Sequence, residues 1–406
     1  MNQIQTRCCV VGGGPAGMML GFLLARSGVE VLVLEKHADF FRDFRGDTIH
    51  PSTMELLHEL GLLEEFLRLP HQKLPRLKLS IEGRIVDGPD CSHLPVRCKF
   101  IALMPQWDFL NFLAAHAKKL PSFSLKMKSE VTGLIFENEK VTGVRAKTDD
   151  GELEVRADFV FGTDGRHSTV RQSAGLKLQD FGVPIDVLWF RLPKSSGSPD
   201  FLLGRIRNGQ LMVTIDRDDY FQVAVVIPKG AFEKIQRDGL EAFRKNIAAI
   251  TPEFCDVVKD LDDWNKIKLL TVQINRLRQW HRAGLLCIGD AAHAMSPAGG
   301  VGINLAIQDA VATANLLADK ILRNECTTED LALVQRRREF PVRMIQRIQI
   351  FIHRQMFGKN SSKAISLPWP ARKILALLAP LLRRIGARIV GIGFRPEHIE
   401  TIASKQ

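Results

Sequence analysis

The first 35 residues constrain the fold of this 406-residue chain more than any other segment. An apolar run at Arg7–Val11 leads into the glycine-rich run GGGPAG at positions 12–17, which fits the pattern G-x-G-x-x-G. Pro15 suits the first turn of a helix, and a second apolar run follows at Val31–Leu34. The order of these segments predicts a buried strand, a tight glycine turn, a helix and a second, parallel strand.

Glu35 stands directly after the second predicted strand. A glycine turn without Cβ atoms lets the backbone approach a pyrophosphate, and the free amides of the following helix can hold its phosphates. A carboxylate at the end of the next strand can accept hydrogen bonds from ribose hydroxyls. A lone glycine motif is weak, but this context favours an adenine dinucleotide site over a plain glycine-rich turn.

Two further motifs follow apolar strands much later in the chain. The sequence GTDG at positions 162–165 comes after the run at 159–161, and GDAAH at 289–293 comes after the run at 285–288. Ligands of parallel α/β sheets bind where the carboxyl ends of the strands meet, so we expect three loops to converge on one extended ligand. The alternative, that each Asp only caps the next helix, is less favoured because three such motifs occur in this order.

The remaining pattern divides into helices and short strands. A capping-box pattern at Ser52–Glu55 predicts a helix start, and another helix is predicted over Trp107–Lys118. Four β-rich runs between positions 184 and 228 have no crossover-length helix between them, which predicts a separate antiparallel sheet. We also expect short antiparallel strands at 77–80 and 84–86, further strands at 267–274 and 284–288, and mainly helix from Val301 onward.

Composition excludes several classes of protein. With 45% hydrophobic and 25% charged residues the chain is neither disordered nor of low complexity, and its length favours two packed domains. Its seven cysteines form no C-x-x-C pair and no cluster at zinc spacing, so we expect reduced thiols and no metal site. No signal-peptide core precedes the first strand, and polar residues interrupt the longest uncharged segment, so the expected location is cytoplasmic.

The net charge of +11 is concentrated in the tail. Positions 331–406 contain 15 Lys and Arg and three acids, a net of +12, while the rest of the chain has a net of −1. Within the tail, Ile374–Leu382 has no charge but has basic residues on both sides. Two interpretations stay open: a helix at the inner face of a membrane, or a helical layer over the nucleotide domain. The layer is favoured because Pro380 interrupts the helix. Nucleic acid is not expected, because the tail has few aromatic side chains to stack on bases.

The three motifs, in this order and spacing, resemble the single-component FAD-dependent aromatic hydroxylases typified by para-hydroxybenzoate hydroxylase, over the chain from Arg7 to about Ala310. The resemblance implies an α/β fold in which a Rossmann-like FAD-binding domain is interleaved with an antiparallel-sheet substrate domain and followed by a helical C-terminal region. The expected boundaries are 1–71, 101–178 and 277–330 for the FAD-binding domain, 72–100 and 179–276 for the substrate domain, and 331–406 for the basic helical region.

The resemblance also implies the residues of the FAD site. Arg45 is expected at the phosphates or the flavin edge, Gln106 near the ribityl chain and Asp290 at a ribityl hydroxyl. The backbone at 302–304 is expected to face the pyrimidine ring of the flavin, where a helix start stabilises negative charge. The full set of expected FAD-binding residues is Gly12, Gly14, Pro15, Ala16, Gly17, Glu35, Lys36, Arg45, Gln106, Asp164, Gly165, Gly289, Asp290, Pro297, Gly300, Gly302, Ile303 and Asn304.

NAD(P)H is the reductant that the resemblance implies. In the family the motif at Asp164 and Gly165 supports both FAD and the pyrophosphate of NAD(P)H. We find no second G-x-G-x-x-G unit after a strand, so NAD(P)H is expected to dock transiently on the surface. Arg166 and Arg171 are candidates for its phosphates, weighed evenly against simple surface ion pairs.

Four residues are candidates for the catalytic pocket: Pro297, Arg191, Tyr220 and His50. The proline-proline step of the family after GDAAH is Ser296-Pro297 here, so the loop over the flavin keeps one proline. Tyr220 is the only tyrosine, which argues against a tyrosine relay that deprotonates the substrate. Arg191 is weighed evenly between a pocket residue and an outward strand residue, and a lone histidine such as His50 is more often structural.

Together these assignments predict a monooxygenase. NAD(P)H would reduce FAD, dioxygen would form a flavin C4a-hydroperoxide, and one oxygen atom would hydroxylate an aromatic or heteroaromatic substrate, lipophilic if the membrane interpretation holds. Two alternatives are kept: a flavin-dependent reductase of an isoprenoid-type substrate, and a membrane-associated flavoprotein without turnover. A halogenase is disfavoured because the motif W-x-W-x-I-P is absent. The sequence fixes neither the substrate nor the choice of NADH or NADPH, and it leaves the oligomeric state open.

Overall fold

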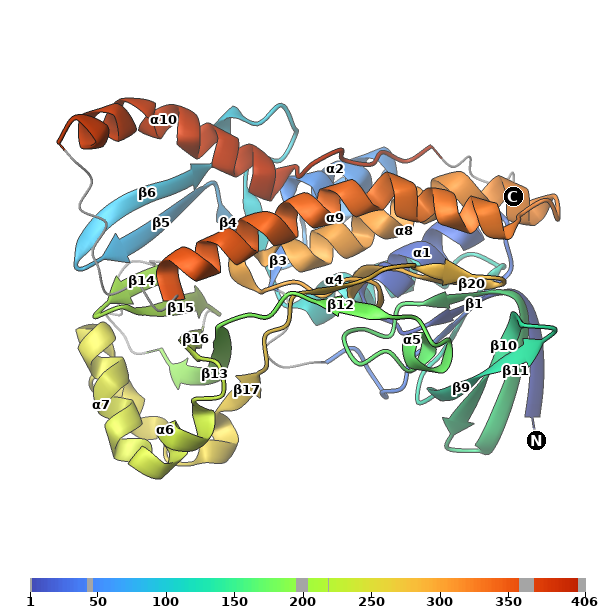
Figure 1. Cartoon of the computed structure of the whole chain (residues 1–406), viewed down its shortest axis with the longest axis horizontal. Helices are drawn as coiled ribbons and strands as arrows, with labels where there is room; N and C mark the ends of the chain where they lie inside the picture. Colours follow the sequence, from blue (N-terminus) through green and yellow to red (C-terminus); the bar gives the residue numbers. More distant parts are fainter. Residues whose placement is uncertain (1, 42–46, 195–203, 218, 358–368, 401–406) are drawn as a thin grey trace.

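Two large sheets lie toward opposite ends of the molecule, and the long helix α9 (Thr328–Phe357) runs from one toward the other (Figure 1). The computed structural model describes residues 2–41, 47–194, 204–217, 219–357 and 369–400. One sheet is mainly parallel, the other is mainly antiparallel, and helices follow them in the chain. This arrangement confirms the α/β fold that the sequence predicts.

The first sheet has the strand order β19-β20-β11-β1-β2-β8, and β9 and β10 extend it from β11. Neighbouring strands from β20 to β8 run parallel. Helices α1, α4 and α8 share one buried core with these strands. The strands are continuous apolar runs without a polar face, so both faces of the sheet need to be covered. The elements are β1 (Asn2–Val11), β2 (Val31–Leu34), β8 (Phe123–Lys126), β9 (Glu130–Glu137), β10 (Lys140–Thr148), β11 (Gly151–Gly162), β19 (His281–Arg282), β20 (Leu285–Cys287), α1 (Pro15–Arg26), α4 (Gln106–Ala117) and α8 (Val301–Leu322).

The glycine turn between β1 and α1 forms as predicted. Gly12 has a φ of +106°, and a Cβ atom there would lie 2.7 Å from the carbonyl oxygen of Thr163. A Cβ atom at Gly17 would lie only 1.9 Å from the carbonyl oxygen of Gly12. Glycine is therefore required at both positions for α1 to pack closely against the ends of β1 and β11.

The second sheet has the strand order β17-β13-β16-β15-β14-β5-β6, and only the β14–β5 pair is parallel. Along β13, Leu188, Phe190 and Leu192 alternate onto a face that packs against α7. The four β-rich runs predicted between positions 184 and 228 are confirmed as strands, with residues 201–203 outside the described part. The elements are β5 (Arg76–Ile81), β6 (Arg84–Asp90), β13 (Ile185–Pro193), β14 (Gly204–Arg207), β15 (Gln210–Asp216), β16 (Tyr220–Pro228), β17 (Lys268–Leu270), α6 (Phe232–Asp238) and α7 (Leu240–Ile250).

Two small sheets and three short helices connect these parts. The strand order of one small sheet is β3-β7-β4, and the other pairs β12 with β18. The elements are β3 (Thr48–Ile49), β4 (Gln72–Leu74), β7 (Ile101–Leu103), β12 (Leu178–Asp180), β18 (Asn275–Leu277), α2 (Pro51–Glu59), α3 (Leu63–Phe66) and α5 (Thr169–Ser173).

Two predicted elements differ from the structure. The helix predicted at Ser52–Glu55 is confirmed as α2, but the capping box is wrong, because α2 begins at Pro51 after His50 and Ser52 lies inside the first turn, with no side-chain cap at the helix start. The predicted strand at 267–274 is reduced to β17, because the amide of Val272 donates to the Asp186 carboxylate at 3.0 Å and not to a neighbouring strand.

The C-terminal region divides between the two sheets. Helix α9 packs along α8, whereas α10 (Trp369–Gly391) packs on β6 (Figure 1). The predicted helical layer over the nucleotide domain applies to α9 and to the end of α10, where Ile389 and Val390 pack against the core of the first sheet, whereas the rest of α10 covers β6. Pro380 does not interrupt α10 as we predicted, because the helix continues through it with the proline exposed. All seven cysteines are free.

One helical segment, Ala298–Leu322, is long and apolar enough to cross a membrane by length and composition alone. In its most apolar window 78% is buried inside the protein. It contains α8, which packs against α1 in the core.

Candidate functional site

The three sequence motifs meet at one edge of the parallel sheet. Val11 lies opposite both Leu34 and Gly162, and Gly162 lies opposite Cys287, so four parallel strands end at the same level. Backbone hydrogen bonds continue into the motifs, from Gly12 to Leu34 at 2.7 Å and from Thr163 to Val11 at 2.9 Å. The loops after β1, β11 and β20 are therefore neighbours, as the sequence predicts.

The start of α1 leaves backbone amides available to an anion. Its N-cap residue Gly14 offers no side-chain acceptor, and apart from its chain neighbours no atom of the described residues lies within 4 Å of where a Cβ of Gly14 would stand. Pro15 and Ala16 follow Gly14 as the first two residues of α1. Unsatisfied amides and open space at a helix start fit a phosphate group.

Glu35 lies beside this turn at the end of β2. Its Oε2 accepts a hydrogen bond from the amide of Gly13 at 2.8 Å. Burial raises the pKa of Glu35, but hydrogen bonds from His37 and Gly13 outweigh it, and the net pKa falls below its ordinary value. Glu35 is thus a buried acceptor at neutral pH, while the neighbouring Lys36 is exposed.

The second motif packs against the glycine turn. The Thr163 hydroxyl donates to the carbonyl oxygens of Val11 at 2.7 Å and Gly12 at 2.8 Å. Asp164 accepts through Oδ2 from the amide of Val170, in the first turn of α5, at 3.1 Å, whereas the N-cap of α5 is Ser168, so capping is not the role of Asp164 alone. Its Oδ1 is buried without a hydrogen-bond partner, and burial raises its pKa. An unpartnered buried carboxylate oxygen fits a hydroxyl or amide donor of a bound ligand.

An ion pair joins the second and third motifs. Arg166 donates from Nε to Asp290 Oδ2 at 3.0 Å, with both side chains partly exposed. Arg171 is buried and donates to the carbonyl oxygens of Ala291 at 2.9 Å and Arg166 at 2.7 Å. The candidacy of Arg171 for NAD(P)H phosphates on the surface is therefore wrong, because its guanidinium is used inside the protein.

A buried carboxylate supports the third motif from behind. Asp309 Oδ2 accepts from His293 Nε2 at 2.6 Å and from the amide of Gly289 at 3.2 Å, while Oδ1 accepts from Arg338 at 3.0 Å. Burial raises the pKa of Asp309, but His293 and Arg338 outweigh it and lower the net value. The ionised side chain therefore fixes the loop that carries Asp290. The sequence analysis assigned a role to neither Asp309 nor Arg338, because no local pattern signals a contact between α8 and α9.

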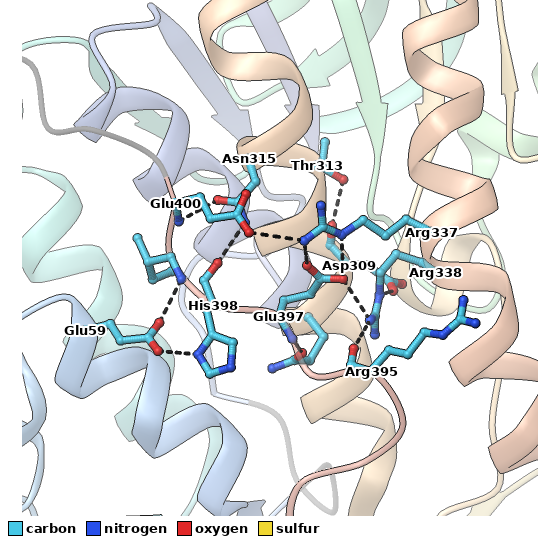
Figure 2. A network of polar contacts seen from close by, with 12 residues as sticks. Glu59, Asp309, Thr313, Asn315, Arg337, Arg338, Arg395, Glu397, His398 and Glu400 are labelled. Atoms are coloured by element: carbon cyan, nitrogen blue, oxygen red, sulfur yellow. Dashed lines mark hydrogen bonds and ion pairs between the residues drawn. The ribbon is translucent and has the colours of Figure 1, made fainter.

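Figure 2 shows that the segment after α10 also bonds to this network. Arg338 donates to Glu397 at 3.2 Å and to the carbonyl oxygen of Arg395 at 3.2 Å. Arg337 reaches the same Glu397 at 2.6 Å, and His398 bonds to Glu59 of α2 at 2.5 Å. The segment after α10 is thereby tied to α2, α8 and α9.

The third motif continues into a glycine loop that starts α8. Gly300 has a φ of +62°, and the Thr48 hydroxyl donates to its carbonyl oxygen at 3.1 Å. Asn304 Oδ1 accepts from the amide of His50 at 3.1 Å, which joins α8 to the start of α2. The start of α8 has no side-chain cap, and the space beside Gly302 is open. Like α1, α8 therefore offers unsatisfied amides around Gly302 and Ile303 to a negatively charged group.

Ser296-Pro297 is clamped by α9. The amide of Ser296 donates to Gln349 Oε1 at 3.1 Å, and Gln349 Nε2 donates back to the carbonyl oxygens of Ser296 and Ala298 at 3.0 Å. His353 Nε2 lies 2.8 Å from the Ser296 hydroxyl. A proline at position 296 has no amide to donate, so this departure from the family's pattern supplies a contact that holds the loop around Pro297.

Arg191 and Tyr220 lie on the face of the antiparallel sheet opposite α7. The Arg191 guanidinium stands 4.8 Å from the centre of the Tyr220 ring. Gln222, directly across from Arg191, donates to Asp47, which also pairs with Arg217 at 2.6 Å. Asp47 is followed by Thr48, which bonds to Gly300 at the start of α8. This face of the sheet is therefore turned toward the start of α8. Arg45 lies outside the described residues.

His50 and Gln106 are both buried. His50 Nδ1 lies 2.6 Å from the carbonyl oxygen of Val390, and burial lowers its pKa to about 4. His50 is therefore neutral at physiological pH and ties α2 to the end of α10, which favours the structural interpretation over a catalytic one. Gln106 begins α4, which packs against α1.

Comparisons with known proteins agree with this geometry. A family model for an FAD binding domain matches residues 5–347. The 6-methylpretetramide 4-monooxygenase of Streptomyces rimosus is 33% identical over 95% of this chain and 92% of its own length. The rifampicin monooxygenase of Streptomyces venezuelae is 29% identical over 74% of this chain, which spans only 61% of that longer relative.

Solved structures have the same fold. The anhydrotetracycline hydroxylase OxyS of Streptomyces rimosus superposes with a TM-score of 0.77 at 22% identity. The match covers 96% of this chain and 76% of that chain. At this identity the likeness supports the fold and not the substrate.

Proposed function

The chain belongs to the FAD-dependent aromatic hydroxylase family, and from this premise we propose that it is an NAD(P)H-dependent monooxygenase that hydroxylates an aromatic or heteroaromatic small molecule with dioxygen. The observation that carries the proposal is the meeting of three motifs at one edge of the parallel sheet. Bound FAD would supply the chemistry that side chains lack, hydride acceptance from NAD(P)H and activation of dioxygen. The names of the relatives, which are monooxygenases of organic compounds, support this class of reaction.

The chain's own residues would bind and orient the cofactor. The amides at the start of α1 would hold the pyrophosphate, and Glu35 would accept from the adenosine ribose. Asp164 Oδ1 and Asp290 would accept further hydroxyl hydrogen bonds, with Asp290 held in place by Arg166. The start of α8 would stabilise negative charge on the ring system.

Arg191 and Tyr220 would line the side from which the substrate approaches. Both stand on the sheet face that is turned toward Asp47 and the start of α8. The Tyr220 ring lies under a guanidinium, so we assign it packing and not a proton relay. Water exclusion between this face and the ring system would protect the reaction from wasteful peroxide release.

NAD(P)H would dock transiently, with Arg166 as the remaining arginine candidate because Arg171 is buried. Dioxygen and the aromatic compound are the other small-molecule partners. A cytoplasmic location belongs to the same proposal.

The first experiment is to purify the protein and record the flavin spectrum, then to follow a ring compound under ¹⁸O₂. One labelled oxygen atom in the product, with NAD(P)H consumed in equal amount and little peroxide, is the expected result. A reduced product without label would support the reductase alternative, and no NAD(P)H oxidation with any compound would support a flavoprotein without turnover.

A second experiment tests the substrate face. Arg191→Met should raise KM for the aromatic substrate several-fold and leave the flavin spectrum unchanged. Arg205→Met is the matched control, because Arg205 stands on another strand of the same sheet and pairs with Glu253 at 2.9 Å, away from Asp47. Equal effects of the two substitutions on KM would remove Arg191 from the pocket.

A further inference from the structure

Helix α10 packs against the protein through its small residues. It lies along β6 at the outside of the molecule (Figure 1). Ala387 is buried, and Cβ atoms at Gly386 and Gly391 would lie 3.4 Å from Pro89 and 2.8 Å from Leu94. Ile389 and Val390, near the end of the helix, pack against the core. Before them, over residues 377–388, the inner side of the helix contributes small residues and little apolar bulk.

The large apolar residues of α10 occupy the outer side. Positions 377, 378, 381, 382 and 385 repeat at the spacing of one helix face. Their exposed fractions run from 42% to 81%, with Leu377 the highest. We call this surface the leucine face; its members are Leu377, Leu378, Leu381, Leu382 and Ile385. Monomeric proteins rarely leave a contiguous apolar stripe in water, and such a stripe marks a contact with another apolar phase or molecule.

The charges beside the leucine face are positive. Arg384 and Arg388 are exposed and follow Leu377 and Leu381 by seven residues, so they stand along its edge. No acid occurs within α10. Arg383, on the inner side, is paired with Asp87 of β6 at 3.5 Å.

The acids elsewhere in the tail do not offset this charge. Glu339 lies near Arg276 and Arg343, while Glu397 and Glu400 pair with Arg337 in the network of Figure 2. Arg336, Arg338 and Arg383 pair with acids outside the tail. Arg384 and Arg388 form no ion pair with the described residues, so their charge is left for an external anion.

These observations select one occupant. A second copy of the leucine face would set arginines against arginines with no acid on the helix to pair them, so charge opposes self-association. An anionic bilayer offers acyl chains to the leucines and phosphates to the arginines at the edge. We propose that α10 is a peripheral membrane-binding helix, which lays its leucine face into the surface of an anionic bilayer. This proposal does not rest on the catalytic one.

The test is co-sedimentation of the purified full chain with vesicles of phosphatidylcholine alone and of phosphatidylcholine mixed with phosphatidylglycerol. The wild-type protein should bind the mixed vesicles and bind them more weakly as salt is added. The double variant Leu377→Ser, Leu381→Ser should lose roughly tenfold or more in partitioning, because less apolar surface enters the bilayer. The variant Arg384→Gln, Arg388→Gln should lose about tenfold or more on the mixed vesicles and change little on phosphatidylcholine.

Leu269→Ser is the matched control, since Leu269 on β17 is 42% exposed, as Leu378 is. It should bind vesicles as the wild type does, and all variants should keep the wild-type melting temperature because the changed side chains are exposed. Absence of vesicle binding would overturn the proposal. So would binding that salt abolishes but the leucine substitutions leave unchanged, or a dimer in solution that the leucine substitutions dissociate while vesicle binding stays unaltered.

Discussion

Asp309 and Arg338 form a fully buried ion pair, with 3.0 Å between Arg338 Nε and Asp309 Oδ1. The pair joins α8 to α9 directly behind the loop that carries Asp290, because the second oxygen of Asp309 holds Gly289 and His293. Two charges in a low-dielectric interior are tolerated only when each is paired, and Glu397 completes the pairing on the far side of Arg338. The support of the nucleotide loop thus extends to the last described segment of the chain.

Removing the cation from this pair should be costly. Arg338→Met leaves Asp309 and Glu397 buried with less compensation and should lower the free energy of unfolding by about 3–5 kcal/mol. Arg336→Met is the control, because Arg336 pairs with Glu329 on the surface, and it should cost under about 1 kcal/mol. Urea denaturation of the two variants measures both values. Equal costs would mean that the buried pair contributes no more than a surface one.

The histidine before α2 makes stability depend on pH. Burial lowers the pKa of His50 to about 4 in the folded chain, below the ordinary value of 6.5. As pH falls, His50 is protonated in the unfolded chain before it is protonated in the folded chain. The contribution of neutral His50 to the free energy of unfolding is therefore complete above pH 6.5 and is lost as pH falls toward 4. The loss over that window should be about 3 kcal/mol for this group.

His50→Asn isolates the effect, because asparagine keeps an N–H donor for the Val390 carbonyl oxygen and does not titrate. Melting curves of both proteins between pH 7 and pH 4.5 provide the comparison. The difference in stability between wild type and variant should shrink as pH falls. A difference that is constant over this window would contradict a buried neutral His50.

The sequence could predict the nucleotide-binding edge because local chemistry determines it. A strand, a glycine turn and an acid at the next strand each leave a pattern within a few residues, and parallel pairing then brings Val11, Gly162 and Cys287 to one level. The capping box failed for the opposite reason. The start of α2 is set by Pro51 at its first position and by Asn304, 254 residues away, which accepts from the amide of His50, so Ser52 stands inside the first turn and does not cap it.

The parts that could not be predicted are contacts between distant segments. Gln349 of α9 holds the backbone of Ser296, and neither residue carries a motif that predicts the contact. The position of α10 also depends on packing, since an amphipathic pattern predicts an apolar face but not whether protein covers it. Here small residues take the inner side against β6, and only the end of α10, at Ile389 and Val390, reaches the core of the parallel sheet.

The clamp on the loop around Pro297 should affect cofactor binding. Gln349→Leu removes the partners of three backbone groups at Ser296 and Ala298, so the glycine loop that follows loses its support. We expect the Kd for FAD to rise by roughly tenfold, from one lost net interaction of about 1.4 kcal/mol. Flavin fluorescence during titration of the apoprotein measures the change.

Gln335→Leu is the control for the clamp. Gln335 also lies on α9 and makes two hydrogen bonds to backbone groups, at Trp280 and Arg278, away from the glycine loop. It should lower the melting temperature as Gln349→Leu does but leave the Kd for FAD near the wild-type value. A rise in Kd of the same size in both variants would assign the effect to general destabilisation.

The same added methyl group should lower the stability of the apoprotein at Gly17 and the affinity for FAD at Gly14. At Gly17 the Cβ would stand 1.9 Å from the Gly12 carbonyl oxygen and 2.6 Å from the Thr163 hydroxyl, so Gly17→Ala should lower the stability of the apoprotein by about 1–3 kcal/mol or more. At Gly14 the Cβ would meet no atom of the described residues within 4 Å beyond its chain neighbours, and φ is −74°, so Gly14→Ala should leave the apoprotein within about 0.5 kcal/mol of wild type. The open space beside Gly14 is where we place the pyrophosphate, and the methyl group should therefore raise the Kd for FAD by about tenfold or more.

Thermal unfolding of the apoproteins and flavin titration separate the two effects. If Gly14→Ala binds FAD as tightly as wild type, the pyrophosphate does not lie against the start of α1.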